Sequence, residues 1–196
     1  MNVIFSLVLF KQSLDVISPL LSNIDSFYNY GLKNDLRTYL YIYDNSPFKN
    51  NELSKLLNKK YIKYVFDKRN IGFGRGHNKN LLTNKNFDNN TLFIVVNPDI
   101  TFDYIDLFNY LRSFNKSNNV CVAPLVVNER EQIQYSVKKN PTVLSLFIGR
   151  FKCLRALKKI DFFYKYHVNF IRNYKSEKIN ATYLSGCFLI VKSSIY

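Results

Sequence analysis

The chain has 196 residues, of which 47% are hydrophobic, 16% aromatic and 21% charged. This composition supports one folded domain with its own core and argues against a disordered or fibrous protein. No apolar run approaches the roughly 18 residues that a transmembrane helix needs, and no basic leader precedes the apolar run Val3–Phe10. A cytoplasmic protein is therefore expected.

The formal net charge of +14 is concentrated toward the C-terminal end of the chain. Residues 1–137 carry 16 Lys and Arg against 12 Asp and Glu, whereas residues 138–196 carry 12 against two. This distribution predicts a basic patch that faces a membrane, a diphosphate or a nucleic acid. For the segment 138–178, an ordinary solvated basic surface is the alternative.

Apolar runs alternate with helical periodicities along most of the chain. Strands are predicted at Val3–Phe10, Thr38–Tyr43, Tyr61–Phe66, Leu92–Val96, Val120–Ala123 and Ala181–Val191. Helices are predicted from Ser13 to Gly31 and over Glu52–Lys59, His77–Thr83 and Asp103–Phe114, with a glycine-rich turn at Gly72–Gly76 and a basic amphipathic helix near residues 152–159. The alternation indicates an α/β fold with a mostly parallel sheet.

The cysteines and histidines form no metal-ligand pattern. Cys121, Cys153 and Cys187 are odd in number and widely spaced, and His77 and His167 do not complete a set with them. Buried, reduced thiols are the expectation.

Polar clusters follow three of the predicted strands, where ligands bind in parallel sheets. In Asp44-Asn45-Ser46, the Asp44 carboxylate could accept the imide N–H of uracil or thymine, or could hold an Asx turn. In Asn97-Pro98-Asp99, Asp99 could bind Mg²⁺ or Mn²⁺ between two phosphates, or Pro98 could simply shape a β-turn.

The third cluster is the glycine-rich segment Asn70–Asn78. Its alternate glycines would let the backbone approach a ligand closely, and a flexible turn is the alternative. The G-x-G-x-G spacing, placed after the third strand rather than the first, disfavours a dinucleotide-dependent oxidoreductase.

Together with Ser185-Gly186-Cys187, these clusters resemble the family 2 glycosyltransferases of GT-A fold. The resemblance is greatest to the rhamnosyltransferase-like enzymes of bacterial surface-polysaccharide assembly, which carry D-N-x-S, N-x-G-F-x-x-G-x-N and N-P-D segments in this order. Pro124-Leu125 and Pro141-Thr142 also match that pattern, and the resemblance extends from Val3 to Val191.

The resemblance implies a Rossmann-like fold that binds a nucleotide-diphosphate sugar. It implies that Asp44 contacts the base, that Asp99 binds the ribose or a divalent metal (Mg²⁺ or Mn²⁺), and that Ser185 and Gly186 lie near the donor sugar or acceptor. The full set of implied binding residues is Asp44, Asn45, Asn70, Gly72, Phe73, Gly74, Asn78, Asn97, Asp99, Ser185 and Gly186.

The sequence departs from the family at three places. The first strand ends Phe10-Lys11 rather than Tyr-Asn, and His77 replaces an asparagine or a small residue. Family members continue past the last strand into an acidic pair that supplies the catalytic base, whereas this sequence ends at Tyr196. We therefore expect an incomplete GT-A domain: a donor-binding core over 1–137, the basic segment 138–178 and a last strand in 181–191, with the base beyond Tyr196.

The function implied is inverting transfer of a sugar from dTDP-rhamnose or a UDP-sugar to a lipid-linked or polysaccharide acceptor, in O-antigen or capsule biosynthesis. The basic segment would contact the anionic inner face of the cytoplasmic membrane. A nucleotide-sugar-binding remnant without catalysis is the first alternative. A nucleic-acid-binding protein is disfavoured, because the aromatic residues lie mostly within apolar runs and no RNA-binding signature is present.

Overall fold

The computed structural model describes residues 1–83, 88, 90–134, 137–138 and 183–193. The chain divides into two compact units: Met1–Val122 with Gly186–Tyr196, and Ala123–Ser185. Within the described ranges, none of the helices combines the length and the apolarity that crossing a membrane requires.

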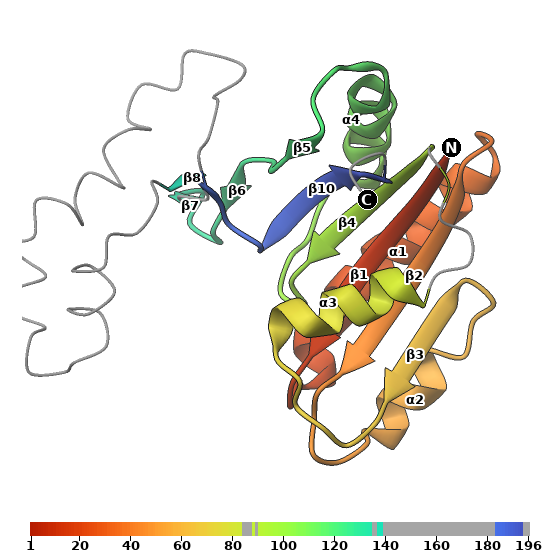
Figure 1. Ribbon diagram of the computed structural model, residues 1–196, viewed down its shortest axis with the longest axis vertical. Coiled ribbons are helices and arrows are strands. Elements are labelled where there is room, and N and C mark those ends of the chain that lie inside the picture. Colours follow the sequence, from red (N-terminus) through yellow and green to blue (C-terminus); the bar gives the residue numbers. More distant parts are fainter. Residues whose placement is uncertain (84–87, 89, 135–136, 139–182, 194–196) are drawn as a thin grey trace, which may run out of the picture. The chain divides into compact units, whose positions relative to one another are not determined.

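The described residues of the first unit form a six-stranded sheet with four helices (Figure 1). Its strands are β1 (Asn2–Leu9), β2 (Arg37–Asp44), β3 (Ile62–Phe66), β4 (Thr91–Val96), β5 (Cys121–Val122) and β10 (Phe188–Lys192). Its helices are α1 (Leu14–Leu32), α2 (Asn51–Leu56), α3 (Phe73–Leu82) and α4 (Tyr104–Lys116).

Strand order across the sheet is β3-β2-β1-β4-β10-β5. The pairs β3–β2, β2–β1 and β1–β4 are parallel, and β10 runs antiparallel to β4 and β5. The predicted α/β class with a mostly parallel sheet is therefore confirmed, and its first four positions follow the 3-2-1-4 order of doubly wound nucleotide-binding sheets.

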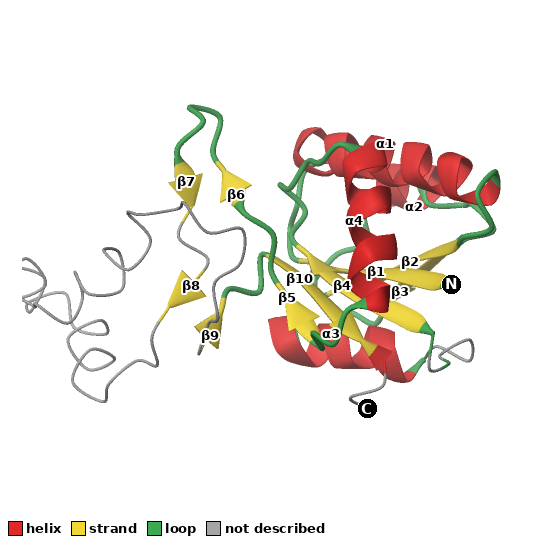
Figure 2. Ribbon diagram, turned by 90° about the horizontal axis from the view of Figure 1, so that it is seen from above, coloured by secondary structure: helices red, strands yellow, loops and turns green. Residues whose placement is uncertain are grey.

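Helices cover both faces of the sheet, α1, α2 and α4 on one face and α3 on the other (Figure 2). The alternation of side chains along β1 explains the layers, because Phe5 packs its ring edge-on to Phe27 of α1 at 5.3 Å while the neighbouring Ser6 contacts His77 of α3. Both faces of β1 are therefore buried, which explains its continuous apolar run.

The strand order reverses between β1 and β4. From β1 the chain continues through α1 to β2 on one side, whereas β4 lies on the other side of β1. Loops that leave the carboxyl ends of β1 and β4 therefore diverge, and this divergence is the usual position of a ligand site in an open α/β sheet.

Two glycine-based boundaries were predicted wrongly. Gly31 lies inside α1 rather than after it, and a Cβ there would come within 3.0 Å of Leu36 Cδ2, so its small size serves packing. The predicted turn at Gly72–Gly76 is mostly helix, because α3 already begins at Phe73. Gly76 of α3 packs against Val8 of β1, so tertiary packing there outweighs the low helix propensity of glycine.

The described residues of the second unit form two short antiparallel strand pairs. They are β6 (Val126–Val127) with β7 (Ile133–Gln134), and β8 (Val137–Lys138) with β9 (Tyr183–Leu184). The single strand predicted at Ala181–Val191 is wrong, because a turn at Gly186 and Cys187 separates β9 from β10. The helix predicted near 152–159 lies outside the described residues.

Of the cysteines, Cys121 and Cys187 are free thiols and are half-buried rather than fully buried. Burial raises the pKa of the Cys121 thiol, so this group stays protonated near neutral pH. Cys153 and His167 lie outside the described residues.

Candidate functional site

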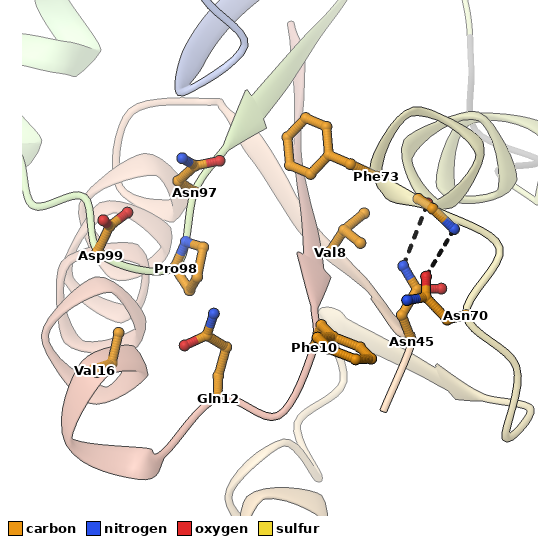
Figure 3. Close-up of a pocket in the computed structure, with 11 residues that line it drawn as sticks. Val8, Phe10, Gln12, Val16, Asn45, Asn70, Phe73, Asn97, Pro98 and Asp99 are labelled. Atoms are coloured by element: carbon orange, nitrogen blue, oxygen red, sulfur yellow. Dashed lines mark hydrogen bonds between the residues drawn. The ribbon is translucent and has the colours of Figure 1, made fainter. Parts of the chain in front are cut away.

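A cleft of about 450 Å³ opens at the carboxyl ends of β1, β2 and β4. Asn97, Pro98 and Asp99 lie on one side and Asn45, Asn70 and Phe73 on the other, with Val8 and Phe10 between them (Figure 3). The volume falls within the roughly 300–1,000 Å³ of small-molecule sites. The cleft is therefore the candidate site of the first unit.

The cleft brings together six of the residues predicted from sequence: Asn45, Asn70, Gly72, Phe73, Asn97 and Asp99. Five other lining residues were not predicted, namely Val8, Phe10, Gln12, Val16 and Pro98. For the first four, the signal in the sequence was a position near the end of the first strand or the start of the first helix, which flank the switch point of such a sheet. Pro98 belongs to the Asn97-Pro98-Asp99 cluster that the sequence already singled out.

Asp44 does not line this cleft. Its side chain is buried, at 1% exposure, and one carboxylate oxygen accepts the Ser46 N–H at 2.8 Å while the other accepts the Tyr64 hydroxyl at 2.6 Å. Burial and the Asp44 carboxylate both raise the pKa of Tyr64, which keeps that hydroxyl a donor. The Asx turn offered as the alternative is thus present, and the nucleobase contact of Asp44 stays a prediction.

Asn45 holds the loop between β3 and α3 at the edge of the cleft. Its Oδ1 accepts the Ile71 N–H at 3.1 Å, and its Nδ2 donates to the Gly72 carbonyl at 3.3 Å. Asn45 is 3% exposed, so these two bonds replace water for its buried amide. An amide supplies both a donor and an acceptor, which explains why asparagine rather than aspartate suits this position.

The loop ends in a turn with a positive φ at Gly72, and this turn starts α3. The Asn70 side chain accepts the Gly72 N–H at 3.0 Å, and Gly72 adopts φ +89° and ψ 165° as the N-cap residue. This backbone conformation is nearly exclusive to glycine. The N-terminus of the ten-residue helix α3 therefore begins at the cleft, where helix N–H groups and the helix dipole favour an anion.

We expect opposite results from alanine at Gly72 and at Gly74. Gly72→Ala forces a side chain into the strained conformation and should lower the free energy of unfolding by about 1–3 kcal/mol. Gly74 lies in the first turn of α3 with no atom within 4 Å of an ideal Cβ, so Gly74→Ala should be neutral or stabilising by up to about 1 kcal/mol. Urea unfolding of both variants checks this, and equal effects would contradict it.

Asn97, Pro98 and Asp99 form a tight turn after β4. The Ile100 N–H donates to the Asn97 carbonyl at 3.3 Å with Pro98 at the second position, and the Asn97 N–H donates to the Cys187 carbonyl at 2.9 Å. The β-turn offered as the alternative is therefore present. It presents the Asp99 carboxylate to solvent, with no side-chain partner in the described part of the chain.

The donor atoms at this turn fit a hard divalent cation. Asp99 offers a carboxylate and Asn97 an amide oxygen, and Mg²⁺ commonly binds proteins through one or two carboxylates while water and substrate phosphates complete its shell. The described residues include no group of three or more His, Cys, Asp or Glu placed to hold a metal. A cation at Asp99 would therefore depend on a phosphate-bearing ligand.

A buried polar cluster of Ser6, His77 and Asn80 lies against Phe73. His77 Nδ1 lies 2.7 Å from Ser6 Oγ, and Asn80 Nδ2 donates to the same oxygen at 2.9 Å. The Phe73 ring meets the His77 ring edge-on at 4.4 Å between centroids. Burial lowers the pKa of His77 to about 4, so the imidazole is neutral near pH 7.

The remaining predicted residues lie away from the cleft lining. Asn78 lies on the exposed side of α3, and Gly74 has no close neighbour. Gly186 is adjacent to Phe73, since a Cβ on Gly186 would lie 3.4 Å from Phe73 Cε1. Ser185 belongs to the second unit. The binding roles of all four stay predictions.

Neither a scan against protein-family models nor a search of curated proteins finds a match to this chain.

Proposed function

We propose that the cleft binds a nucleotide-diphosphate sugar and that the protein is a GT-A glycosyltransferase. The observation that carries this proposal is the meeting of three sequence segments, ending β2, starting α3 and following β4, around one cleft at the point where strand order reverses. These are the segments that resemble family 2 glycosyltransferases. Their convergence around one cleft is what supports the proposal.

Within this proposal, each wall of the cleft has a chemical role. The N-terminus of α3 stabilises the diphosphate through helix N–H groups, and Phe10 and Phe73 offer apolar ring surfaces to the base or sugar. Asp99, with Asn97 beside it, would hold Mg²⁺ or Mn²⁺, which when bound offsets the charge that develops on the leaving diphosphate. Asn45 fixes the loop that carries Asn70 and Gly72.

Transfer with inversion also needs a group that takes the proton from the attacking hydroxyl. Among the described residues that line the cleft, Asp99 is the one carboxylate, and the proposal uses it for the cation. This observation favours, as the second candidate, a protein that binds the nucleotide sugar without transferring it. Release of free nucleoside diphosphate from the donor on adding a saccharide acceptor separates the two candidates.

The donor we propose is dTDP-rhamnose or a UDP-sugar, and the acceptor is a lipid-linked saccharide or polysaccharide of O-antigen or capsule biosynthesis. A cytoplasmic location at the membrane's inner face suits such an acceptor. The basic segment 138–178 would contact that anionic surface, with each nearby Lys or Arg contributing about 1 kcal/mol. The net charge of the segment is the ground for this part of the proposal.

We expect Asp99→Asn to remove the metal-dependent part of donor binding. The protein is titrated with UDP and dTDP, in Mn²⁺ or in EDTA, and should bind more tightly in Mn²⁺. In Asp99→Asn, this increase in affinity should be at least about tenfold smaller. Asn keeps the shape of Asp99 but removes the charge that attracts the cation.

Asp15→Asn is the matched control, because it removes the same charge from the exposed first turn of α1, outside the cleft lining. This variant should bind as the unaltered protein does. If neither nucleotide binds, or if Asp99→Asn and Asp15→Asn have equal effects, the proposed site is wrong.

A further inference from the structure

A second cleft, of about 570 Å³, lies beside α3 and shares no lining residue with the first. Tyr43 of β2, Val65 of β3 and the side of α3 that carries Arg75 bound it. The loop between β3 and α3 is the wall between the two clefts, because Asn70 and Gly72 line the first, whereas Arg69 and Ile71 line the second. Of the residues implied to bind the nucleotide sugar, Asn78 lines this second cleft, and the others do not.

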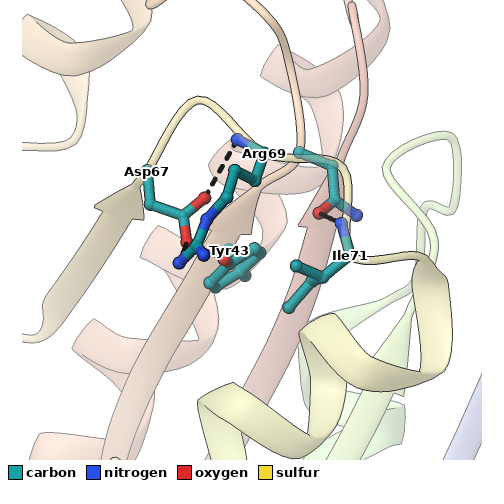
Figure 4. Close-up of polar contacts among 5 residues, drawn as sticks. Tyr43, Asp67, Arg69 and Ile71 are labelled. Atoms are coloured by element: carbon teal, nitrogen blue, oxygen red, sulfur yellow. Dashed lines mark hydrogen bonds and ion pairs between the residues drawn. The ribbon is translucent and has the colours of Figure 1, made fainter.

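One carboxylate lines the second cleft, and it is already paired. Asp67 accepts the Tyr43 hydroxyl at 2.5 Å and the Arg69 N–H at 3.1 Å, and it forms an ion pair with the Arg69 guanidinium at 3.2 Å (Figure 4). These hydrogen bonds, that of Tyr43 first, hold the pKa of Asp67 below its usual value. Asp67 is therefore anionic and offsets the charge of Arg69.

The cleft has two other cations, Arg75 and Lys79, and no carboxylate in its lining offsets their charges. They lie four residues apart on α3, so they share one face of the helix, and like charges at that spacing repel. In the described part of the chain, neither side chain has a hydrogen-bond or ion-pair partner. An anion between them would remove the repulsion and would gain the forked donors of the guanidinium.

The walls of this cleft distinguish it from an ordinary basic helix face. Val65, Ile71 and Leu82 line it with apolar surface, and Asn78 and Thr83 add polar groups. The combination of an apolar wall with two unpaired cations suits an organic molecule that carries a phosphate. The three cations and Asp67 leave a net charge of +2, which matches a phosphate dianion.

We propose that the second cleft binds a phosphate-bearing ligand, a monoester or a diphosphate, through Arg75 and Lys79, with the organic part of the ligand against Ile71 and Leu82. The ligand could be a free metabolite or the headgroup of a lipid, since both present the same group. The inference does not depend on the proposed function, because no residue of the first cleft takes part.

Pyrophosphate is the probe for the soluble form of the ligand. Binding is measured by calorimetric titration in EDTA, which suppresses metal-dependent binding at Asp99. The double variant Arg75→Gln with Lys79→Gln should bind pyrophosphate at least about tenfold more weakly than the unaltered protein. Lys55→Gln with Lys60→Gln removes two exposed charges outside both clefts and should change the affinity by less than about twofold. Arg75→Lys keeps the positive charge but loses the forked donors of the guanidinium. Its affinity for pyrophosphate should therefore lie between the affinities of the two double variants.

Vesicles are the probe for the lipid form. Sedimentation with phosphatidylcholine vesicles, with and without phosphatidic acid, should show binding that depends on phosphatidic acid and on Arg75 and Lys79 if the ligand is a headgroup. Thermal unfolding of each variant establishes that it is folded. The proposal is overturned if the double variant at Arg75 and Lys79 binds both pyrophosphate and vesicles as well as the double variant at Lys55 and Lys60 does.

Discussion

Replacing Gly76 by alanine should destabilise the protein by about 1–3 kcal/mol, although alanine is the better helix former. An ideal Cβ at Gly76 would lie 2.7 Å from Val8 Cγ2 and 3.0 Å from its Cγ1. Val8 is β-branched, buried and fixed on the central strand β1, so it has few rotamers with which to yield. The helix α3 would have to move away from the sheet.

The double variant Gly76→Ala with Val8→Ala tests this cause. Val8→Ala alone should destabilise by leaving a cavity, but it also removes the two methyl groups that the new Cβ would meet. We therefore expect the double variant to be more stable than the sum of the single effects by at least about 1 kcal/mol, measured by urea unfolding. Simple additivity would contradict the clash.

The strands and their order along the chain were largely predictable from sequence. Val3–Phe10 and Leu92–Val96 are apolar runs of the kind that only a sheet covered on both faces can bury, and they became β1 and β4 with ends shifted by about a residue. The position of Asn97-Pro98-Asp99 at the cleft followed from a related rule, because parallel strands bring their carboxyl ends to one edge of the sheet.

The side chains that face the cleft were harder to predict, because adjacent residues point to opposite sides. Asp44 and Asn45 are neighbours, yet Asp44 shares a face with Tyr64 of β3, and Asn45 reaches the loop before α3. The sequence does not contain the register that pairs Ile42 with Tyr64, so the hydrogen bond from the Tyr64 hydroxyl to Asp44 became visible only in the fold.

The three alternate glycines show the same limit in another form. A shared role was predicted for them, the approach of backbone to a ligand, but they differ in the structure. Gly72 adopts a positive φ, and Gly76 lets α3 approach Val8 closely. A Cβ at Gly74 would have no atom within 4 Å. Conformation and tertiary packing separate these roles, and neither can be deduced from the spacing of glycines alone.

Acid should destabilise the protein through His77. The pKa of His77 is about 4 in the folded protein and near 6.5 for an unperturbed histidine, so between these values the unfolded chain takes up a proton and the folded one does not. The resulting contribution of His77 to the free energy of unfolding is fully present above about pH 6.5 and is lost as the pH falls toward 4. It amounts to about 3 kcal/mol in all. Protonation would place a charge on a ring whose Nε2 is buried without a hydrogen-bond partner in the described residues.

Comparison with His77→Gln isolates this contribution, because glutamine fills a similar volume and does not titrate. Between about pH 7.5 and pH 5, the free energy of unfolding of the unaltered protein should fall about 2 kcal/mol further than that of His77→Gln. Carboxylates that titrate in this range are common to both proteins and cancel in the difference. Parallel pH profiles for the two proteins would mean that His77 becomes charged in the folded state, and the buried cluster beneath Phe73 would then have to accommodate an imidazolium.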